Sequence, residues 1–270
     1  MLYVPAHRPA MLAKTQSIPA DFFVVDLEDG VAPAEKSAAR DNVREAAGKG
    51  RLPHDRWGLR VNHDGSKWFE DDMQLAEEVK PPAVVLPKAE DPVVVASVAG
   101  RVTGDDCAIA LMIETALGVG RARELAAADG SVNALFYGAA DLERSLGARP
   151  GADRTWERHA MSEIVLAARM AVCAAIDAVT FAYRNEEKLE SDARVARELG
   201  FDGKGCIHPA QIETIHRVFS STSDEVEWAE RVLREWKTQD GERAGVVVIG
   251  HEMIEGVHVE IARRILARRA

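Results

Sequence analysis

The sequence FFVVDLEDGVAP at residues 22–33 sets an apolar run directly against a group of acids. Residues 22–25 are aromatic or β-branched, which is typical of a buried β-strand. Asp26, Glu28 and Asp29 follow at once, so the predicted strand ends in three carboxylates. Three acids at one strand end repel one another unless a cation or another charged side chain lies near them. The ends of the other apolar runs indicate what that partner is.

Short apolar runs recur along the chain, and segments of helical composition separate them. Eight runs begin at Leu2, Phe22, Trp57, Ala83, Ala108, Ala134, Ile176 and Gly203. The segments between them, such as 35–50 and 186–200, are rich in Ala, Glu and Arg and end at glycine. Apolar strands that alternate with helices predict a parallel sheet buried on both faces, and eight units close a (β/α)8 barrel. We therefore expect an α/β TIM barrel over residues 1–220.

Residues 221–270 follow the eighth unit and are not needed to close a barrel. Thr222 and Glu225 have the spacing of a helix capping box, and the segment after them is rich in helix formers. We expect a C-terminal helical extension over 221–270 that packs on the barrel or on a neighbouring subunit.

Composition excludes several kinds of partner. The 270 residues carry a formal net charge of -10, which opposes binding to nucleic acid or to an anionic membrane surface. The chain contains neither the apolar core of a signal peptide nor a run of about 18 apolar residues. Cys107, Cys173 and Cys206 are far apart and lack CxxC spacing, so we expect free thiols and a soluble, cytoplasmic protein.

The eight apolar runs end in polar side chains that would meet in the folded barrel. In a (β/α)8 barrel the active site lies at the C-terminal ends of the strands. The polar residues at these ends are Asp26, Glu28, Asp29, Arg60, Asn62, Lys88, Glu114, Asp141 and His208. We expect them to surround one pocket.

Glu114 and Asp141 follow neighbouring runs and would repel each other unless a cation or a proton lies between them. Because the set offers oxygen ligands, Mg²⁺ is the expected ion, and Glu28 and Asp29 could hold its water ligands. Arg60 has the planar fork that binds a carboxylate. The pattern predicts a pocket for a small α-oxo or α-hydroxy acid, in which the metal polarises the carbonyl.

Simpler structural roles remain open for these residues. Glu114 and Asp141 could cap the helices that follow them, and the acids at 26–29 could be N-caps. Arg60 could form an ion pair with one of those acids. Lys88 could face the substrate or form an ion pair at the barrel end, and for His208 a structural role is the preferred expectation.

The ordered motifs resemble those of a known family. YVPAHRP, VVDLEDGV, RVN, LPKAED, IETALGV, YGAADLERSLGA, GFDGKGCIHPAQI and MIEGVHVEIARRIL together are similar to the citrate lyase β-subunit-like family, which includes malyl-CoA and citramalyl-CoA lyases. The resemblance runs from Leu2 to about Leu266. It implies a (β/α)8 barrel, usually a homotrimer, that cleaves or forms a β-hydroxyacyl-CoA thioester by Mg²⁺-assisted chemistry, with a keto acid as the other product or substrate.

The resemblance also implies roles for single residues. Glu114 and Asp141 correspond to the metal ligands, which also bind substrate, and Arg60 corresponds to the arginine that holds the keto acid. Arg8 and Lys14 correspond to basic residues that hold the coenzyme A phosphates. Glu255 stands at the position of an aspartate that acts as acid and base from an adjacent subunit.

The chain departs from the family pattern at two places. Ala6 and His7 replace the usual residues of the coenzyme loop, and Glu255 replaces aspartate, with Val257 in place of a proline of many relatives. A longer acid changes the reach on which proton transfer depends.

Four functions therefore stay open at this stage. The first is the acyl-CoA lyase. The others are a citrate lyase β subunit acting on citryl-acyl carrier, an idle keto-acid- or CoA-binding regulatory protein, and an aldolase for free hydroxy-keto acids. Glyoxylate, pyruvate and oxaloacetate all fit as the keto acid.

Overall fold

The computed structural model describes residues 1–270 with the exception of 103–106, 150–153, 156 and 269–270. The chain divides into two compact units, Met1–Ile215 and His216–Ala270. This division lies a few residues before the boundary expected from the sequence.

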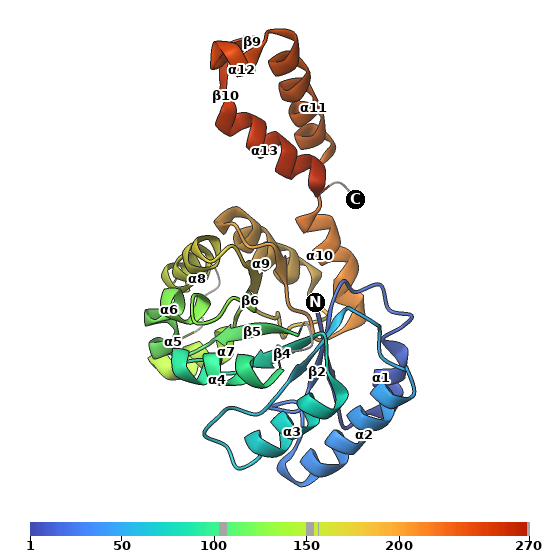
Figure 1. The fold of residues 1–270 in the computed structure, drawn as a ribbon. Coiled ribbons are helices and arrows are strands. Elements are labelled where there is room, and N and C mark those ends of the chain that lie inside the picture. Colours follow the sequence, from blue (N-terminus) through green and yellow to red (C-terminus); the bar gives the residue numbers. More distant parts are fainter. Residues whose placement is uncertain (103–106, 150–153, 156, 269–270) are drawn as a thin grey trace. The chain divides into compact units, whose positions relative to one another are not determined.

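The first unit contains eight parallel strands that pair in the order of the chain (Figure 1). A bridge between Leu2 and Cys206 then joins the last strand end to the first, with Tyr3 N–H donating to Cys206 O at 3.0 Å. The eight-stranded barrel predicted from the sequence is confirmed. The strands are β1 (Leu2–Pro5), β2 (Phe23–Asp26), β3 (Trp57–Arg60), β4 (Ala83–Leu86), β5 (Ala108–Ile113), β6 (Val132–Tyr137), β7 (Ala174–Asp177) and β8 (Gly203–Lys204).

Helices connect successive strands, as a parallel sheet requires. Short 3-10 helices at Pro33–Glu35 and Pro209–Gln211 precede α2 and α10. The α-helices are α1 (Pro9–Lys14), α2 (Lys36–Gly48), α3 (Phe69–Val79), α4 (Pro92–Val102), α5 (Ala116–Gly120), α6 (Ala122–Ala126), α7 (Ala139–Leu146), α8 (Arg158–Met170), α9 (Glu186–Leu199) and α10 (Ile212–Phe219).

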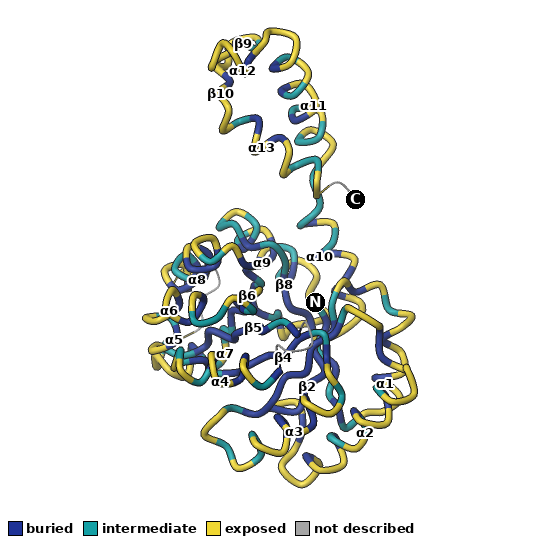
Figure 2. Tube along the Cα trace, viewed as in Figure 1, coloured by how far each residue is buried: buried dark blue, intermediate teal, exposed yellow. Residues whose placement is uncertain are grey.

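The core of the first unit is built from alternate residues of neighbouring strands. Val24, Val85, Met112 and Phe136 belong to one buried cluster, and they come from β2, β4, β5 and β6. On β2 and β4 the residues between them are buried as well, so these two strands are dark blue along their length in Figure 2. Burial on both faces explains why these strands read as continuous apolar runs in the sequence.

The second unit contains a long helix, a short helix, a β-hairpin and a final helix. It comprises α11 (Ser223–Thr238), α12 (Gly241–Ala244), the antiparallel strands β9 (Val246–Ile249) and β10 (Glu252–Glu255), and α13 (Gly256–Ala267). The capping box is present: Thr222 N–H donates to Glu225 Oε2 at 2.7 Å, and Glu225 N–H donates to Thr222 Oγ1 at 3.2 Å. The extension expected to be helical therefore also contains a β-hairpin.

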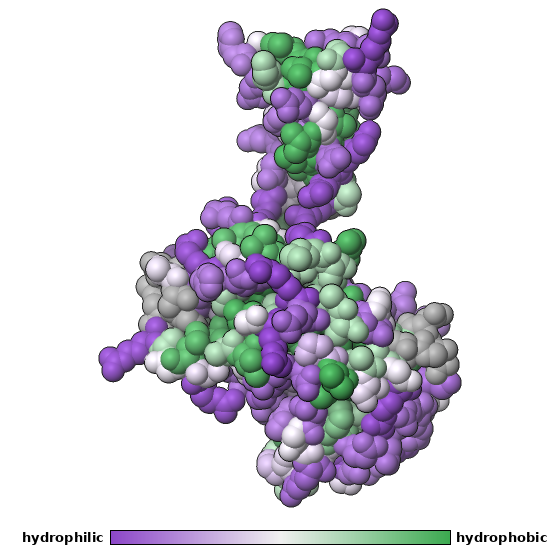
Figure 3. Space-filling model, turned by 60° about the vertical axis from the view of Figure 1, so that its left-hand side comes forward, coloured by the Kyte–Doolittle hydropathy of each residue, from purple (hydrophilic) through white to green (hydrophobic). Residues whose placement is uncertain are grey.

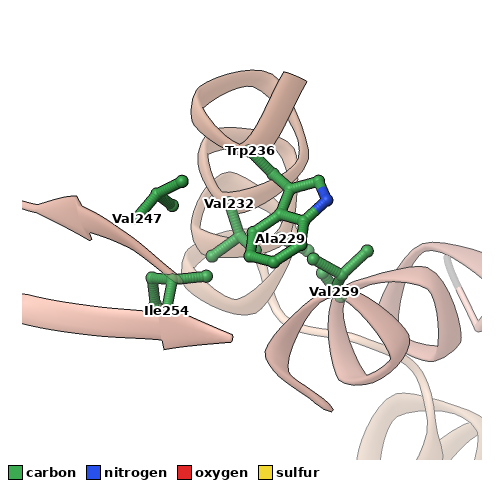
Figure 4. Packing of buried hydrophobic residues seen from close by; sticks show 7 residues of the cluster. Ala229, Val232, Trp236, Val247, Ile254 and Val259 are labelled. Atoms are coloured by element: carbon green, nitrogen blue, oxygen red, sulfur yellow. The ribbon is translucent and has the colours of Figure 1, made fainter. Parts of the chain in front are cut away.

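The second unit has its own small hydrophobic core (Figure 4). Val247 and Ile254 of the hairpin face Val232 and Trp236 of α11, and α13 contributes Val259. Gly241 is required beside this core, because a Cβ at that position would overlap the Trp236 ring. The residues after the barrel can thus form a packed unit.

Two further expectations concern the whole chain. Cys107, Cys173 and Cys206 are buried free thiols, as predicted. Among the helices of the described residues, none combines the length and the apolar character needed to cross a membrane.

Candidate active site

The pairing of β2 with β3 places Asp26 opposite Arg60 at the C-terminal edge of the sheet. Arg60 Nε and Nη2 donate to the two Asp26 oxygens, each at 2.7 Å, and this bidentate geometry is the strong form of the pair. The N–H groups of Glu28 and Gly30 also donate to Asp26, at 2.8 and 2.9 Å. Burial alone would raise the pKa of Asp26, but Arg60 and these N–H groups hold it below its usual range. Asp26 therefore stays ionised and fixes Arg60.

Arg60 forms the ion pair that the sequence left open as an alternative. Its Nη1 lies 3.0 Å from Glu28 Oε2 and 3.5 Å from Met112 Sδ. Burial disfavours the charged form, yet Asp26 and Glu28 hold the pKa of Arg60 well above its ordinary value. Because Asp26 occupies the Nε and Nη2 edge, a keto acid would be bound by the donors that remain on Nη1 and Nη2.

Glu114 follows β5 and is 1% exposed. One of its oxygens, Oε1, accepts a hydrogen bond from Lys88 N–H at 2.8 Å. Burial, and next the charge of Glu28, raise the pKa of Glu114 to about 7; Arg60 and Lys88 oppose the rise, and Asp141 adds to it. At neutral pH this carboxyl is therefore poised between its neutral and its charged form.

Asp141 lies in the first turn of α7, and not on a strand. Its Oδ1 is 2.5 Å from Arg144 Nη2 and 4.0 Å from Lys88 Nζ. Gly138 precedes this helix and packs against Glu114, so closely that a Cβ at Gly138 would overlap Glu114 Oε2 and Cβ. The glycine lets the end of β6 approach the buried carboxylate.

Glu28 and Asp29 lie beside Lys88. Glu28 is buried and forms an ion pair with Lys88 Nζ through Oε1, whereas its Oε2 makes no hydrogen bond of regular geometry despite the nearby Arg60. Burial raises the pKa of Glu28, although Arg60 and Lys88 oppose the rise. The Asp29 side chain is 64% exposed and lies 3.6 Å from Lys88 Nζ.

A cavity of about 420 Å³ lies at the C-terminal ends of the strands, and charged side chains line one side of it. Asp26, Asp29, Arg60, Glu114 and Asp141 form its charged wall. An apolar wall completes it, formed by Tyr3, Met112, Ala178, Val179, Phe181 and Ile207 among others. With a divalent cation among its carboxylates, the cavity would suit a small anionic molecule with an apolar part.

The donor set of this cavity fits Mg²⁺. Glu114 and Asp141 supply two carboxylates, and the described residues contain no cluster of three or more His, Cys, Asp or Glu side chains arranged around a metal position. One or two carboxylates are what Mg²⁺ commonly takes from a protein, since it keeps several waters. Burial, and then the charges of Glu28 and Asp141, raise the pKa of Glu114. A cation bound beside these carboxylates would stabilise their charged forms.

Lys36 belongs to the site although sequence reasoning did not select it. From the start of α2, its Nζ donates to Leu27 O at 2.6 Å, to Glu28 O at 2.7 Å and to Asn62 Oδ1 at 2.7 Å. A lysine in a helix rich in charged residues is usually exposed, so little in the sequence indicates this role. The one available signal is that a buried loop needs donors for its carbonyl groups.

Not all predicted residues line this cavity. Glu28, Asn62 and Lys88 line a neighbouring cavity together with Asp29 and Asp141, whereas Arg8, Lys14, His208 and Glu255 line neither of the two. Arg8 caps the N-terminus of α1 and Lys14 lies in its last turn; both are exposed. Glu255 belongs to the second unit, is exposed, and donates its N–H to His258 Nδ1 at 3.0 Å.

Two contacts hold the His208 ring, one at a ring nitrogen and one on the ring face. Its Nδ1 accepts from Ala210 N–H at 3.1 Å, and the ring stacks on Tyr183 with centroids 4.9 Å apart. These contacts agree with the structural role that was preferred for it.

Comparisons with known proteins point to one family. A family model described as HpcH/HpaI aldolase/citrate lyase matches residues 1–209. A (3S)-malyl-CoA thioesterase from Cereibacter sphaeroides is 33% identical over 268 residues, which cover 99% of this chain and 93% of that protein. The citrate lyase subunit beta of Escherichia coli is 32% identical over 278 aligned residues, covering 99% of this chain and 92% of that protein.

A solved structure has the same fold. It is CitE from Mycobacterium tuberculosis in complex with magnesium, acetoacetate and coenzyme A, with a TM-score of 0.84 and 33% sequence identity. The match covers 99% of this chain and 96% of that one.

Proposed function

This chain belongs to the HpcH/HpaI aldolase/citrate lyase family, and we propose that it is a Mg²⁺-dependent carbon–carbon lyase. Its substrate would be a β-hydroxyacyl-CoA thioester such as malyl-, citramalyl- or citryl-CoA, cleaved into an acyl-CoA and a small keto acid, or formed from them. The observation that carries the proposal is the convergence of Glu114, Asp141 and Arg60 on one cavity. The relative bound to magnesium, acetoacetate and coenzyme A supports it.

Glu114 and Asp141 would hold the metal, and Glu28 and Asp29 would hold its water ligands. When bound, magnesium supplies polarisation of the keto-acid carbonyl. Arg60, kept cationic by Asp26, would bind the keto-acid carboxylate through its remaining N–H donors. Arg60 and Asp26 already form their ion pair without substrate, so substrate binding would need little reorganisation of Arg60.

Glu255 would move the proton at the thioester carbon. When the carbon–carbon bond breaks, the β-hydroxyl passes its proton to water and becomes the keto-acid carbonyl, the electron pair of the broken bond stays with the acyl-CoA carbon, and Glu255 would protonate that carbon; the reverse direction would run these proton transfers backwards. The fragment beyond the reacting carbons would extend to Arg8 and Lys14, which would hold the coenzyme A phosphates. Glu255 would come from an adjacent subunit of a homotrimer.

The proposal includes a cytoplasmic location. Three buried free thiols support it, because disulfides are rare in a reducing compartment.

Thioester hydrolysis is the second candidate function. It is favoured by the name of the Cereibacter sphaeroides relative, a (3S)-malyl-CoA thioesterase that aligns with 99% of this chain. Hydrolysis would release a hydroxy acid and free coenzyme A, whereas the lyase reaction would release a keto acid and an acyl-CoA.

The test uses the purified full chain with Mg²⁺ and, in separate reactions, malyl-, citramalyl-, methylmalyl- and citryl-CoA and citryl-acyl carrier. We expect keto acid and acyl-CoA to appear together, and the Glu114→Ala variant to produce neither. Free coenzyme A without keto acid would establish hydrolysis instead. Turnover of citryl-acyl carrier alone would indicate a citrate lyase β subunit, and binding without turnover would indicate a regulatory protein.

A further inference from the structure

Lys88 follows β4 and places its amine among the acids of the candidate active site. Its Nζ forms an ion pair with Glu28 Oε1 and lies 3.6 Å from Asp29 Oδ2 and 4.0 Å from Asp141 Oδ1. The side chain is 19% exposed, so carboxylates surround the amine more than water does. The function proposed above assigns no role to this charge.

The backbone of Lys88 is tied to the same site. Its φ of 50° lies in the left-handed region, which residues other than glycine adopt at a cost. Its N–H donates to Glu114 Oε1 at 2.8 Å. One residue therefore contacts both proposed metal ligands, Glu114 through its backbone and Asp141 through its amine.

The amine balances negative charge that would otherwise repel. Glu28, Asp29, Glu114 and Asp141 lie close together, while Arg60 is engaged chiefly by Asp26. The ion pair with Glu28 Oε1 keeps the amine protonated. Lys88 is therefore a cation within the acid cluster.

A divalent ion bound by Glu114 and Asp141 would compete for Asp141 with this amine, 4.0 Å away, and with Arg144, whose Nη2 lies 2.5 Å from Asp141 Oδ1, and its charge would repel the amine. We propose that Lys88 is an internal cation that stabilises the acid cluster of the metal-free protein and that Mg²⁺ displaces from Asp141 when it binds. The inference rests on the proposed magnesium site. It makes Lys88 a positioning residue that sets the metal affinity of the site.

The test is a calorimetric titration of Mg²⁺ into the EDTA-treated full chain. The Lys88→Met variant keeps the aliphatic stem and the backbone N–H but loses the charge, so we expect it to bind Mg²⁺ about tenfold more tightly than wild type. Without metal the variant should unfold at a lower temperature than wild type, and saturating Mg²⁺ should raise its midpoint by more. The Lys88→Arg variant keeps the charge and should bind with nearly wild-type affinity.

Lys67→Met is the matched control, because Lys67 is an exposed lysine after β3 whose amine lies over the Trp68 ring. It removes the same charge and should leave the affinity unchanged. If wild type binds Mg²⁺ and Lys88→Met binds it equally or more weakly, the inference fails while the proposed function stands. If wild type binds none, the proposed metal site fails as well. Should Lys88→Met not fold, Lys88→Gln is measured against the same expectations.

Discussion

At the scale of single residues, Glu114 and Gly138 depend on each other. The Glu114 carboxyl is buried, and it occupies the space that a Cβ at position 138 would need. The carboxyl also accepts the Lys88 N–H, which fixes one of its oxygens. A site with a buried acid in this position tolerates little displacement, because catalytic geometry is lost with shifts of about 1 Å.

The Gly138→Ala variant tests this dependence. The added methyl group would overlap both the Cβ and Oε2 of Glu114, so Glu114 must leave its position. We expect Mg²⁺ binding and lyase turnover to fall together by about tenfold or more, while the variant remains folded. Gly48→Ala is the control, since a Cβ there meets nothing within 4 Å. Full Mg²⁺ affinity in Gly138→Ala would contradict the close packing of this pair.

Sequence alone could name Glu114, Asp141 and Arg60, because charged residues directly after apolar runs are conspicuous. It could not decide that Asp26 takes the fork of Arg60, because both the ion pair and the substrate contact use the same donors. Lys36 was missed for another reason. Its three acceptors are two backbone carbonyls and an amide oxygen, which leave no pattern in the sequence.

At the scale of elements, a buried ion cluster links the last two strands. Asp177 of β7 accepts from Lys204 Nζ of β8 at 2.7 Å and from Arg154 Nη2 at 2.8 Å. The two strands share only two paired positions, Ile176 with Gly203 and Asp177 with Lys204. The cluster therefore supplements the short β7–β8 ladder, which lies next to the point where the barrel closes.

The Asp177→Asn variant would leave Lys204 buried without its charged partner and Arg154 with Glu157 alone. Breaking a buried pair in this way costs roughly 3–5 kcal/mol of unfolding free energy, and we expect a loss of that order in denaturant titrations. The exposed pair of Glu45 and Lys49 provides the control, because Glu45→Gln should change the midpoint far less. Equal midpoints for Asp177→Asn and wild type would mean that the cluster does not stabilise the closure.

The same cluster predicts a pH dependence. Burial alone would raise the pKa of Asp177, but Lys204 and Arg154 hold it below the ordinary value of 3.8. A depressed pKa contributes stability that is present above the unfolded-state pKa and is lost as the pH falls through the folded-state pKa. The stability difference between wild type and Asp177→Asn should stay constant from about pH 5 upward and narrow below about pH 4. A difference that grew on acidification would contradict this assignment.

The elements themselves were predictable to different degrees. The short runs predicted all eight barrel strands. Strands β6 and β7 begin at Val132 and Ala174, two residues before the apolar runs that predicted them. The β9–β10 hairpin was missed because its strands belong to a small unit in which only alternate side chains, such as Val247 and Ile254, are buried. Four-residue strands of this kind give a weak periodic signal.

At the scale of the whole molecule, the proposed acid and base, Glu255, belongs to the second unit. The same unit exposes Val248, Met253 and Val257, each more than half accessible. Figure 3 shows hydrophobic side chains among hydrophilic ones on the visible face of this unit. Such a surface is consistent with contact to another subunit in the proposed trimer.

Mixed oligomers test whether Glu255 acts across subunits. Glu255→Ala and Glu114→Gln should each be inactive alone, because one lacks the acid and the other lacks a metal ligand. If each site combines the cavity of one subunit with Glu255 of the next, random mixed trimers should recover about a quarter of wild-type activity. Co-expressed mixed trimers as inactive as both parents would contradict the shared site.

The most direct test of the account is the binding of Mg²⁺ to the metal-free full chain, measured by calorimetry for wild type, Glu114→Gln and Asp141→Asn. These variants keep the size of each side chain and remove its charge. The account predicts about one ion per chain in wild type and a loss of at least about a hundredfold in affinity for each variant. Wild-type affinity in either folded variant would contradict the claim that these two carboxylates form the metal site.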